Sequence, residues 1–184
     1  MQAHMTPAET IRRVRERARE EAAEYAGGES RPLAGYALAM TTYAGTAGLL
    51  LGASRLARAE VPERPAWSDL ALASLATFRL SRLIAKAPVT SPLRAPFTRY
   101  RGTTGPAELA EEPREGGIRH SVGELVSCPF CLSQWIATGF VSGLVFAPRF
   151  TRMTAATFAI ITAADFLQFA RAAVEQATGE TGDQ

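Results

Sequence analysis

The sequence is poor in the residues on which most enzymes and many binding proteins rely. It has 2 histidines and 2 cysteines among 184 residues, and the cysteines share one CxxC, Cys128-Pro129-Phe130-Cys131. A single CxxC excludes a disulfide-framework fold. The net charge of +2 provides no strong field for a nucleic acid or an acidic partner, and we expect no nucleic-acid binding. No catalytic triad, phosphate-binding loop or paired-carboxylate motif is visible.

Long apolar runs are present, although the mean hydropathy of the whole chain is close to zero. The run Leu33–Ser54 has no charged residue and, at about 1.5 Å per residue, is long enough for the roughly 30 Å hydrocarbon layer of a bilayer. We therefore predict an all-α integral membrane bundle of three or four spans, at 33–54, 67–86, 129–147 and 153–173. A soluble helical domain stays open as an alternative, because Arg79, Arg82 and Asp165 interrupt the second and fourth runs.

The remaining segments are polar. Residues 1–32 lack the apolar region of a signal peptide, and we expect none. Within them Thr6-Pro7-Ala8-Glu9 is a capping box that predicts a charged, amphipathic helix over residues 6–26. Residues 88–127 have no periodicity, and we expect a long polar loop that is ordered near Pro92–Phe97 and carries an acidic patch from Glu108 to Glu115. Residues 174–184 form an acidic tail that we expect to fray.

The distribution of lysine and arginine predicts the orientation of the chain. The N-terminal segment has six arginines and the 88–127 loop has five, against five in the two connections that would lie on the other face. Because the cytoplasmic side of a membrane protein carries the excess of Lys and Arg, both termini and the CxxC are predicted to be cytoplasmic. The predicted location is the bacterial inner membrane, with the chain crossing it several times.

Charged residues inside the predicted spans indicate contacts between helices. Arg79 and Asp165 each lie 12 residues from the start of their span, at Trp67 and Met153, and so at the same depth. Since a lone charge in the bilayer is costly, we predict an Arg79–Asp165 ion pair, either fixing helix register or forming a polar relay. Arg82 and Arg94 are predicted to contact lipid headgroups or the polar loop.

Small residues recur at four-residue spacing in two spans. Gly48 and Gly52 lie in the first run, and Gly139 and Gly143 lie in the third. Such spacing allows the backbones of two membrane helices to approach closely. The pattern predicts helix packing, either within the chain or with a second copy or another membrane protein.

Cys128 and Cys131 have three interpretations. A thiol at a helix start with a second thiol three residues later suits a thiol oxidoreductase, with Cys128 as nucleophile and Cys131 as resolving thiol. Two thiolates are also half of a tetrahedral metal site; since His4 and His120 are not at ligand spacing, zinc or an iron–sulfur cluster would need a dimeric Cys₄ site. The third interpretation is that both cysteines only pack a tight helix entry.

Several motifs together resemble one family. They are Trp67-x-Asp69-Leu70, Phe78-Arg79-Leu80-x-Arg82-Leu83, Pro92-Leu93-Arg94 and Cys128-Pro129-Phe130-Cys131-x-x-x-Trp135. The chain is similar, from about Trp67 to Ala173, to the bacterial membrane proteins catalogued as domain of unknown function 1360, some of which are named as sporulation-associated. The resemblance implies a membrane location and no established activity.

The function predicted from the sequence is therefore that of a non-enzymatic membrane component that assembles with itself or with another membrane protein. A membrane-bound thiol oxidoreductase and a dimeric metal binder are the alternatives. The expected partner in every case is the lipid bilayer, and no cofactor is predicted outside the dimeric Cys₄ case.

Overall fold

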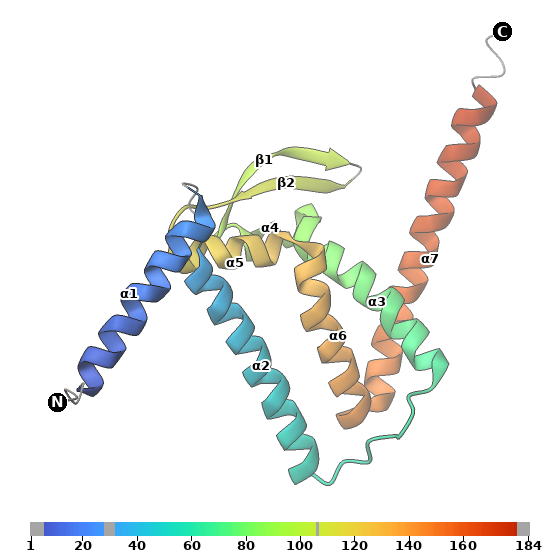
Figure 1. Ribbon diagram of the computed structural model, residues 1–184. Helices are drawn as coiled ribbons and strands as arrows, with labels where there is room; N and C mark the ends of the chain where they lie inside the picture. Colours follow the sequence, from blue (N-terminus) through green and yellow to red (C-terminus); the bar gives the residue numbers. More distant parts are fainter. Residues whose placement is uncertain (1–5, 28–31, 106, 180–184) are drawn as a thin grey trace.

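The computed structural model describes residues 6–27, 32–105 and 107–179 (Figure 1). His4, Arg31 and residues 180–184 lie outside the described residues. The described part is mostly helical, and its elements in chain order are α1 (Pro7–Ala26), α2 (Leu33–Leu56), α3 (Trp67–Lys86), the 3₁₀ turn η1 (Pro88–Thr90), α4 (Ser91–Arg94), β1 (Thr98–Gly105), β2 (Glu108–Pro113), α5 (Gly117–Ser127), α6 (Pro129–Phe146) and α7 (Pro148–Gly179).

Helix α1 begins with the predicted capping box. The Thr6 hydroxyl accepts the Glu9 N–H at 3.4 Å, and the Glu9 carboxylate accepts the Thr6 N–H at 3.0 Å. These bonds satisfy two orphan backbone donors at the start of the helix. The bond from the Thr6 N–H, together with a 3.0 Å contact between the Thr6 hydroxyl and the carboxylate, holds the pKa of Glu9 below its ordinary value. The helix ends at Gly27, which has the left-handed conformation that glycine adopts without strain.

Four long helices run alternately up and down in Figure 1. Helix α2 descends, the segment 57–66 crosses the lower end, α3 returns, α6 descends and α7 returns. The centre of this bundle lies between α3, α6 and α7, where Ala76, Phe140 and Ala155 are buried against one another. At the lower end the Arg152 guanidinium of α7 donates two hydrogen bonds of 2.8 Å to the Asp69 carboxylate of α3.

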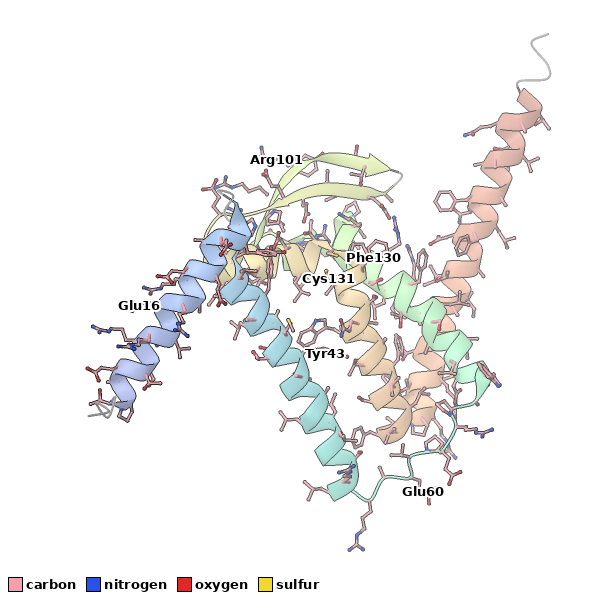
Figure 2. The ribbon with its side chains drawn as sticks, viewed as in Figure 1. Glu16, Tyr43, Glu60, Arg101, Phe130 and Cys131 are labelled. Atoms are coloured by element: carbon pink, nitrogen blue, oxygen red, sulfur yellow. The ribbon has the colours of Figure 1, made fainter. Side chains whose placement is uncertain are left out.

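Helix α2 packs on α5 and α6. The Tyr36 hydroxyl donates a 2.6 Å hydrogen bond to Glu124 of α5. Further along, Tyr43 points from α2 toward α6 (Figure 2), where its hydroxyl lies 2.9 Å from Thr138 Oγ1 and its ring meets Trp135 edge-on at 5.2 Å. Both contacts join residues far apart in the sequence.

Residues 88–127, which we call the cap, are not the irregular loop that the sequence suggested. They form η1, α4, an antiparallel hairpin of β1 and β2, and α5, at the upper end of the long helices. The prediction of an all-α fold is therefore wrong in this segment. The physical reason is that the acidic residues of β2 pair with arginines elsewhere: Glu111 with the buried Arg94, and Glu108 with Arg82 of α3.

Helix α7 is longer than the predicted fourth span. It begins at Pro148, before the predicted start at Met153, because a proline at the first helical position loses no hydrogen bond. It also continues through the predicted tail as far as Gly179, with Arg171 donating a 2.8 Å hydrogen bond to Glu175 one turn later. The expected fraying of residues 174–179 is wrong.

Two described helices, Pro129–Phe146 and Pro148–Thr178, are long and apolar enough to cross a membrane by length and composition. The sequence-based prediction of three or four spans exceeds this number.

Candidate functional site at the cap end of α3

The end of α3 that faces the cap carries two arginines that pair with other elements. Arg79 Nη1 lies 3.2 Å from Asp165 Oδ2 of α7, and the two side chains are about one-third exposed. The structure thus brings together the two charges that the sequence placed at one depth. Among the described residues, no group accepts a hydrogen bond from the Arg79 guanidinium beyond this ion pair.

Arg82, one turn further along α3, holds the tip of the hairpin. Its Nε and Nη2 donate to Glu108 Oε1 at 3.0 and 2.5 Å, and Glu108 is the first residue of β2. The same guanidinium lies over the Phe78 ring, 5.8 Å from its centroid. Because Arg79 and Arg82 are three residues apart on α3, they face α7 and the hairpin from neighbouring positions.

Arg94 is the most deeply buried ionic group in the described part of the chain, with a side chain that is 0 % exposed. Its Nε and Nη2 donate to the two oxygens of Glu111 at 2.7 and 2.8 Å, a bidentate pair. Its Nη1 donates to the carbonyl oxygens of Ile84 and Ala87, at 2.6 and 3.1 Å. These carbonyls end α3, where the helix dipole favours a cation, so Arg94 joins the hairpin to α3.

Glu111 is ionised in this environment. Burial of the carboxyl opposes ionisation, but the hydrogen bonds from Arg94 and from the Thr98 hydroxyl outweigh it, and the pKa of Glu111 is lowered. A fully bonded, charged pair at the base of the hairpin fixes the cap to the bundle. Arg94 therefore has a position inside the protein, away from lipid headgroups, and contacts a part of the predicted loop.

Two grooves border this region. The first, of about 460 Å³, lies between α3 and α6 and is mostly apolar, with Phe130 of the CxxC exposed at its edge. The second, of about 740 Å³, lies between α3, α7 and the hairpin tip. The second groove is lined by both arginines and both of their acidic partners, Arg79, Arg82, Glu108 and Asp165.

The cysteines lie at the junction of α5 and α6, and both are free thiols. Cys128 caps α6, and its sulfur accepts the Cys131 N–H at 3.2 Å. Cys131 is exposed and is visible beside Phe130 at the cap end of α6 (Figure 2). No cluster of three or more His, Cys, Asp or Glu side chains that could hold a metal ion occurs within residues 6–27, 32–105 and 107–179.

Of the four glycines that the sequence spacing selected, only Gly143 lies in a close contact. Around Gly48, Gly52 and Gly139 there is open space, whereas a Cβ on Gly143 of α6 would come within 2.6 Å of Thr151 Oγ1, in the first turn of α7. The closest approaches between distant elements are at Gly35, against Ser121, and at Gly123, against the Phe97 carbonyl.

Glu108 and Glu111 are the site residues that sequence reasoning did not single out. They lay within the recognised acidic patch, but their partners could not be assigned while the segment was taken for a loop. A hairpin signal was available, since an arginine-containing segment and an acidic segment flank Gly105-Pro106.

A family model described as "Protein of unknown function (DUF1360)" matches residues 72–171, which begin within α3 and end within α7. The chain belongs to this family. The DUF1360 match includes the whole cap, Arg79, Asp165 and both cysteines, and it leaves α1 and α2 outside. The resemblance inferred from the sequence motifs is thereby confirmed.

A curated protein named sporulation protein YjcA, from Bacillus subtilis (strain 168), is 36 % identical over 75 residues. The aligned part is 39 % of this chain and 63 % of that protein, so the chain spans less than two thirds of its relative. No solved structure matches the chain.

Proposed function

We propose that this DUF1360 protein is a non-enzymatic, multi-pass membrane component that crosses the bilayer with α2, α3, α6 and α7. The observation that carries the proposal is the distribution of large apolar side chains. On α2 and α7, Met40, Leu49, Ile160 and Leu167 are each 70 % or more exposed. A folded protein in water rarely leaves so many large apolar side chains uncovered, whereas lipid chains cover them without cost.

The buried positions of the bundle support the same proposal. They are occupied mainly by small residues, among them Ala76, Ala155 and Ala159, and Thr162 is almost completely buried. The Thr162 hydroxyl donates to the Leu75 carbonyl across the α3–α7 contact at 3.2 Å. Small residues and hydroxyl bonds at helix contacts, with large apolar side chains facing outward, are typical of helices that pack within a bilayer.

The proposed topology places the cap in the cytoplasm. Arg94, Arg99, Arg101, Arg114 and Arg119 belong to the cap, at the upper end in Figure 1. With Lys86 at the end of α3 and the arginines of the N-terminal segment, which precedes the upper end of α2 in the chain, the segments on that side of the proposed spans have the larger share of positive charge. Four crossings then bring the C-terminal part of α7 to the same side as the start of α2.

Cysteine accessibility tests the topology. In Figure 2, Glu60 lies in the lower connection and Arg101 on the hairpin, so Glu60→Cys and Arg101→Cys report on opposite ends. In a background with Cys128→Ser and Cys131→Ser, we expect a membrane-impermeant maleimide to label the Glu60→Cys variant in intact cells, and the Arg101→Cys variant only after permeabilisation. Labelling of both variants in intact cells, or recovery of the protein in the soluble fraction, would contradict the proposal.

The ion pair between α3 and α7 has a consequence that depends on the membrane. Asp165→Ala leaves Arg79 without its partner inside the bilayer, at a cost of about 2.5 kcal/mol or more, whereas Arg79→Ala together with Asp165→Ala removes both charges. We expect the single change to lower the unfolding temperature in detergent more than the double change does. Additive losses in the four-variant cycle would show that the two charges do not stabilise each other.

Assembly with another copy or with another membrane protein is the proposed activity. The open space around Gly48 and Gly52 supports it, because these glycines lie one turn apart on α2 and a Cβ on either would meet no atom within 4 Å among the described residues. We expect Gly48→Leu with Gly52→Leu to shift the cross-linked oligomer toward monomer in membranes, and Thr46→Leu, on a different face of the same helix, to have a smaller effect. Gly143 is no test of assembly, since its neighbour is Thr151 of the same chain.

A second candidate is a membrane-bound thiol oxidoreductase, favoured by the Cys131 N–H bond to Cys128 Sγ at the start of α6. In that function Cys128 attacks a disulfide of a partner protein, and Cys131 then resolves the mixed disulfide. The Cys131→Ser variant should accumulate the mixed disulfide on acid quenching. If no mixed disulfide formed and the double serine variant assembled fully, the oxidoreductase function would be rejected and the non-enzymatic function would remain.

A further inference from the structure

The groove between α3, α7 and the hairpin tip combines charge with aromatic surface. Its volume is about 740 Å³. Phe78 and Phe166 stack in its wall with their ring centroids 6.0 Å apart, and Phe169 lines it beside them with a 62 % exposed side chain. Glu108, in the hairpin tip, closes the groove on the side of the cap. A ligand in this groove would meet aromatic rings and four charged groups together.

The four charged groups have zero net charge, and each retains unused hydrogen-bonding capacity. Arg79 meets Asp165 in an ion pair between Nη1 and Oδ2, and both Arg82 bonds go to one oxygen of Glu108, Oε1. Within the described residues, Arg82 Nη1, Glu108 Oε2 and Asp165 Oδ1 have no hydrogen-bond partner. Guanidinium donors and carboxylate acceptors thus line the same space. An anion alone would be repelled by the two carboxylates, and a cation alone would be repelled by the two arginines.

In the proposed topology the groove lies just inside the headgroup level, at the cap end of α3. Arg82 is four residues, about 6 Å along the helix, from the cap end of α3 at Lys86, and Arg79 is about 10 Å from it. Since α3 is about as long as the 30 Å hydrocarbon core, both arginines lie just inside its edge, from which their long side chains reach toward the headgroup phosphates. The molecules that reach such a groove from its side are therefore membrane lipids.

We propose that this groove binds a phospholipid with a zwitterionic headgroup that ends in a primary ammonium. The phosphate accepts hydrogen bonds from Arg79 and Arg82, and the ammonium donates to Glu108 and Asp165. The glycerol and the upper part of the acyl chains lie against Phe166 and Phe169. A choline headgroup has no N–H to donate to the carboxylates, so the site distinguishes it from an ethanolamine headgroup. This inference rests on the proposed membrane function and names the class of lipid that the groove between α3, α7 and the hairpin tip would bind.

Lipid binding to the full-length protein in detergent tests the site. Dioleoyl phosphatidylethanolamine, phosphatidylglycerol and phosphatidylcholine are added separately, and bound lipid is counted by native mass spectrometry. We expect phosphatidylethanolamine to bind roughly tenfold more tightly than either of the others, since its headgroup alone bonds with both kinds of charge. Arg79→Gln should reduce this binding by a similar factor, and Arg101→Gln, the same change on the outer side of the hairpin, should not.

Glu108→Gln is expected to increase the binding of one lipid, a result that misfolding of the variant could not produce. It removes a negative charge and an ammonium acceptor, so phosphatidylglycerol should bind more tightly than it does to the unaltered protein. The ratio of phosphatidylethanolamine to phosphatidylglycerol binding is expected to fall by roughly tenfold. Arg101→Gln should leave that ratio unchanged.

Three results would overturn the proposal. Equal binding of the three lipids shows that the groove does not recognise a headgroup, and an unchanged lipid ratio in Glu108→Gln shows that Glu108 does not face the ammonium. Competition by glycerophosphoethanolamine at the same concentration as the lipid shows that the chains make no contact. In each case the protein stays in the membrane fraction, whereas failure of the proposed function itself would place it in the soluble fraction before any lipid is added.

Discussion

Replacing Arg94 with alanine is expected to destabilise the protein by about 3–5 kcal/mol, because it leaves the Glu111 carboxylate buried without its partner. The two residues form a bidentate pair with side chains that are 0 % and 5 % exposed. The change also frees the carbonyl oxygens of Ile84 and Ala87 at the end of α3. The unfolding temperature in detergent, measured with wild-type protein beside it, gives the loss.

Two variants show whether the loss comes from the buried charge. Arg99→Ala removes an exposed arginine of β1 and should cost little, since exposed arginines contribute about 0–1 kcal/mol. Arg94→Met with Glu111→Leu removes both charges and should recover a large part of the stability, as hydrophobic replacements of buried pairs do elsewhere. If Arg94→Ala were as mild as Arg99→Ala, the pair would not hold the cap to α3.

The long helices could be predicted from the sequence because their signals are local. The capping box at Thr6 marked the start of α1, and Trp67, Lys86 and Pro129 marked the ends of α3 and the start of α6 within a residue. The strands of the hairpin gave no such signal beyond the turn residues between them. The first strand, Thr98–Gly105, is exposed at most positions on both of its faces, so it lacks the alternation of apolar and polar residues that identifies a strand.

The part of the site that lies within the long helices could be predicted, because counting residues along a helix gives the depth of each side chain. Counting residues from each span's start placed Arg79 level with Asp165, and the two lie in contact. Arg94 could not be placed in this way, because its partner is in a strand 17 residues later. The same limit applies to the glycines: spacing selected Gly48 and Gly52, which face open space, whereas Gly35 and Gly123 make close contacts that depend on the tertiary fold.

Gly123→Ala is expected to loosen the cap, because a Cβ at this position would lie 2.6 Å from the Phe97 carbonyl oxygen and 3.0 Å from the Pro113 Cβ. That carbonyl accepts the Arg114 N–H at 2.8 Å, so moving it disturbs the base of the hairpin. Overpacking of this kind costs about 1–3 kcal/mol, against a gain of up to about 1 kcal/mol from replacing glycine in a helix. The expected result is a lower unfolding temperature and faster cleavage by trypsin at the hairpin arginines.

Gly45→Ala is the matched control, because Gly45 also lies inside a helix but has nothing within 4 Å of a new Cβ. This variant should be as stable as the wild type or slightly more stable, since only the helix-propensity gain remains. The difference between the two variants measures how closely α5 supports the hairpin whose tip carries Glu108. If trypsin cleaved both at the wild-type rate, the hairpin would be held by Arg94 and Arg82 alone, and the close approach at Gly123 would contribute nothing.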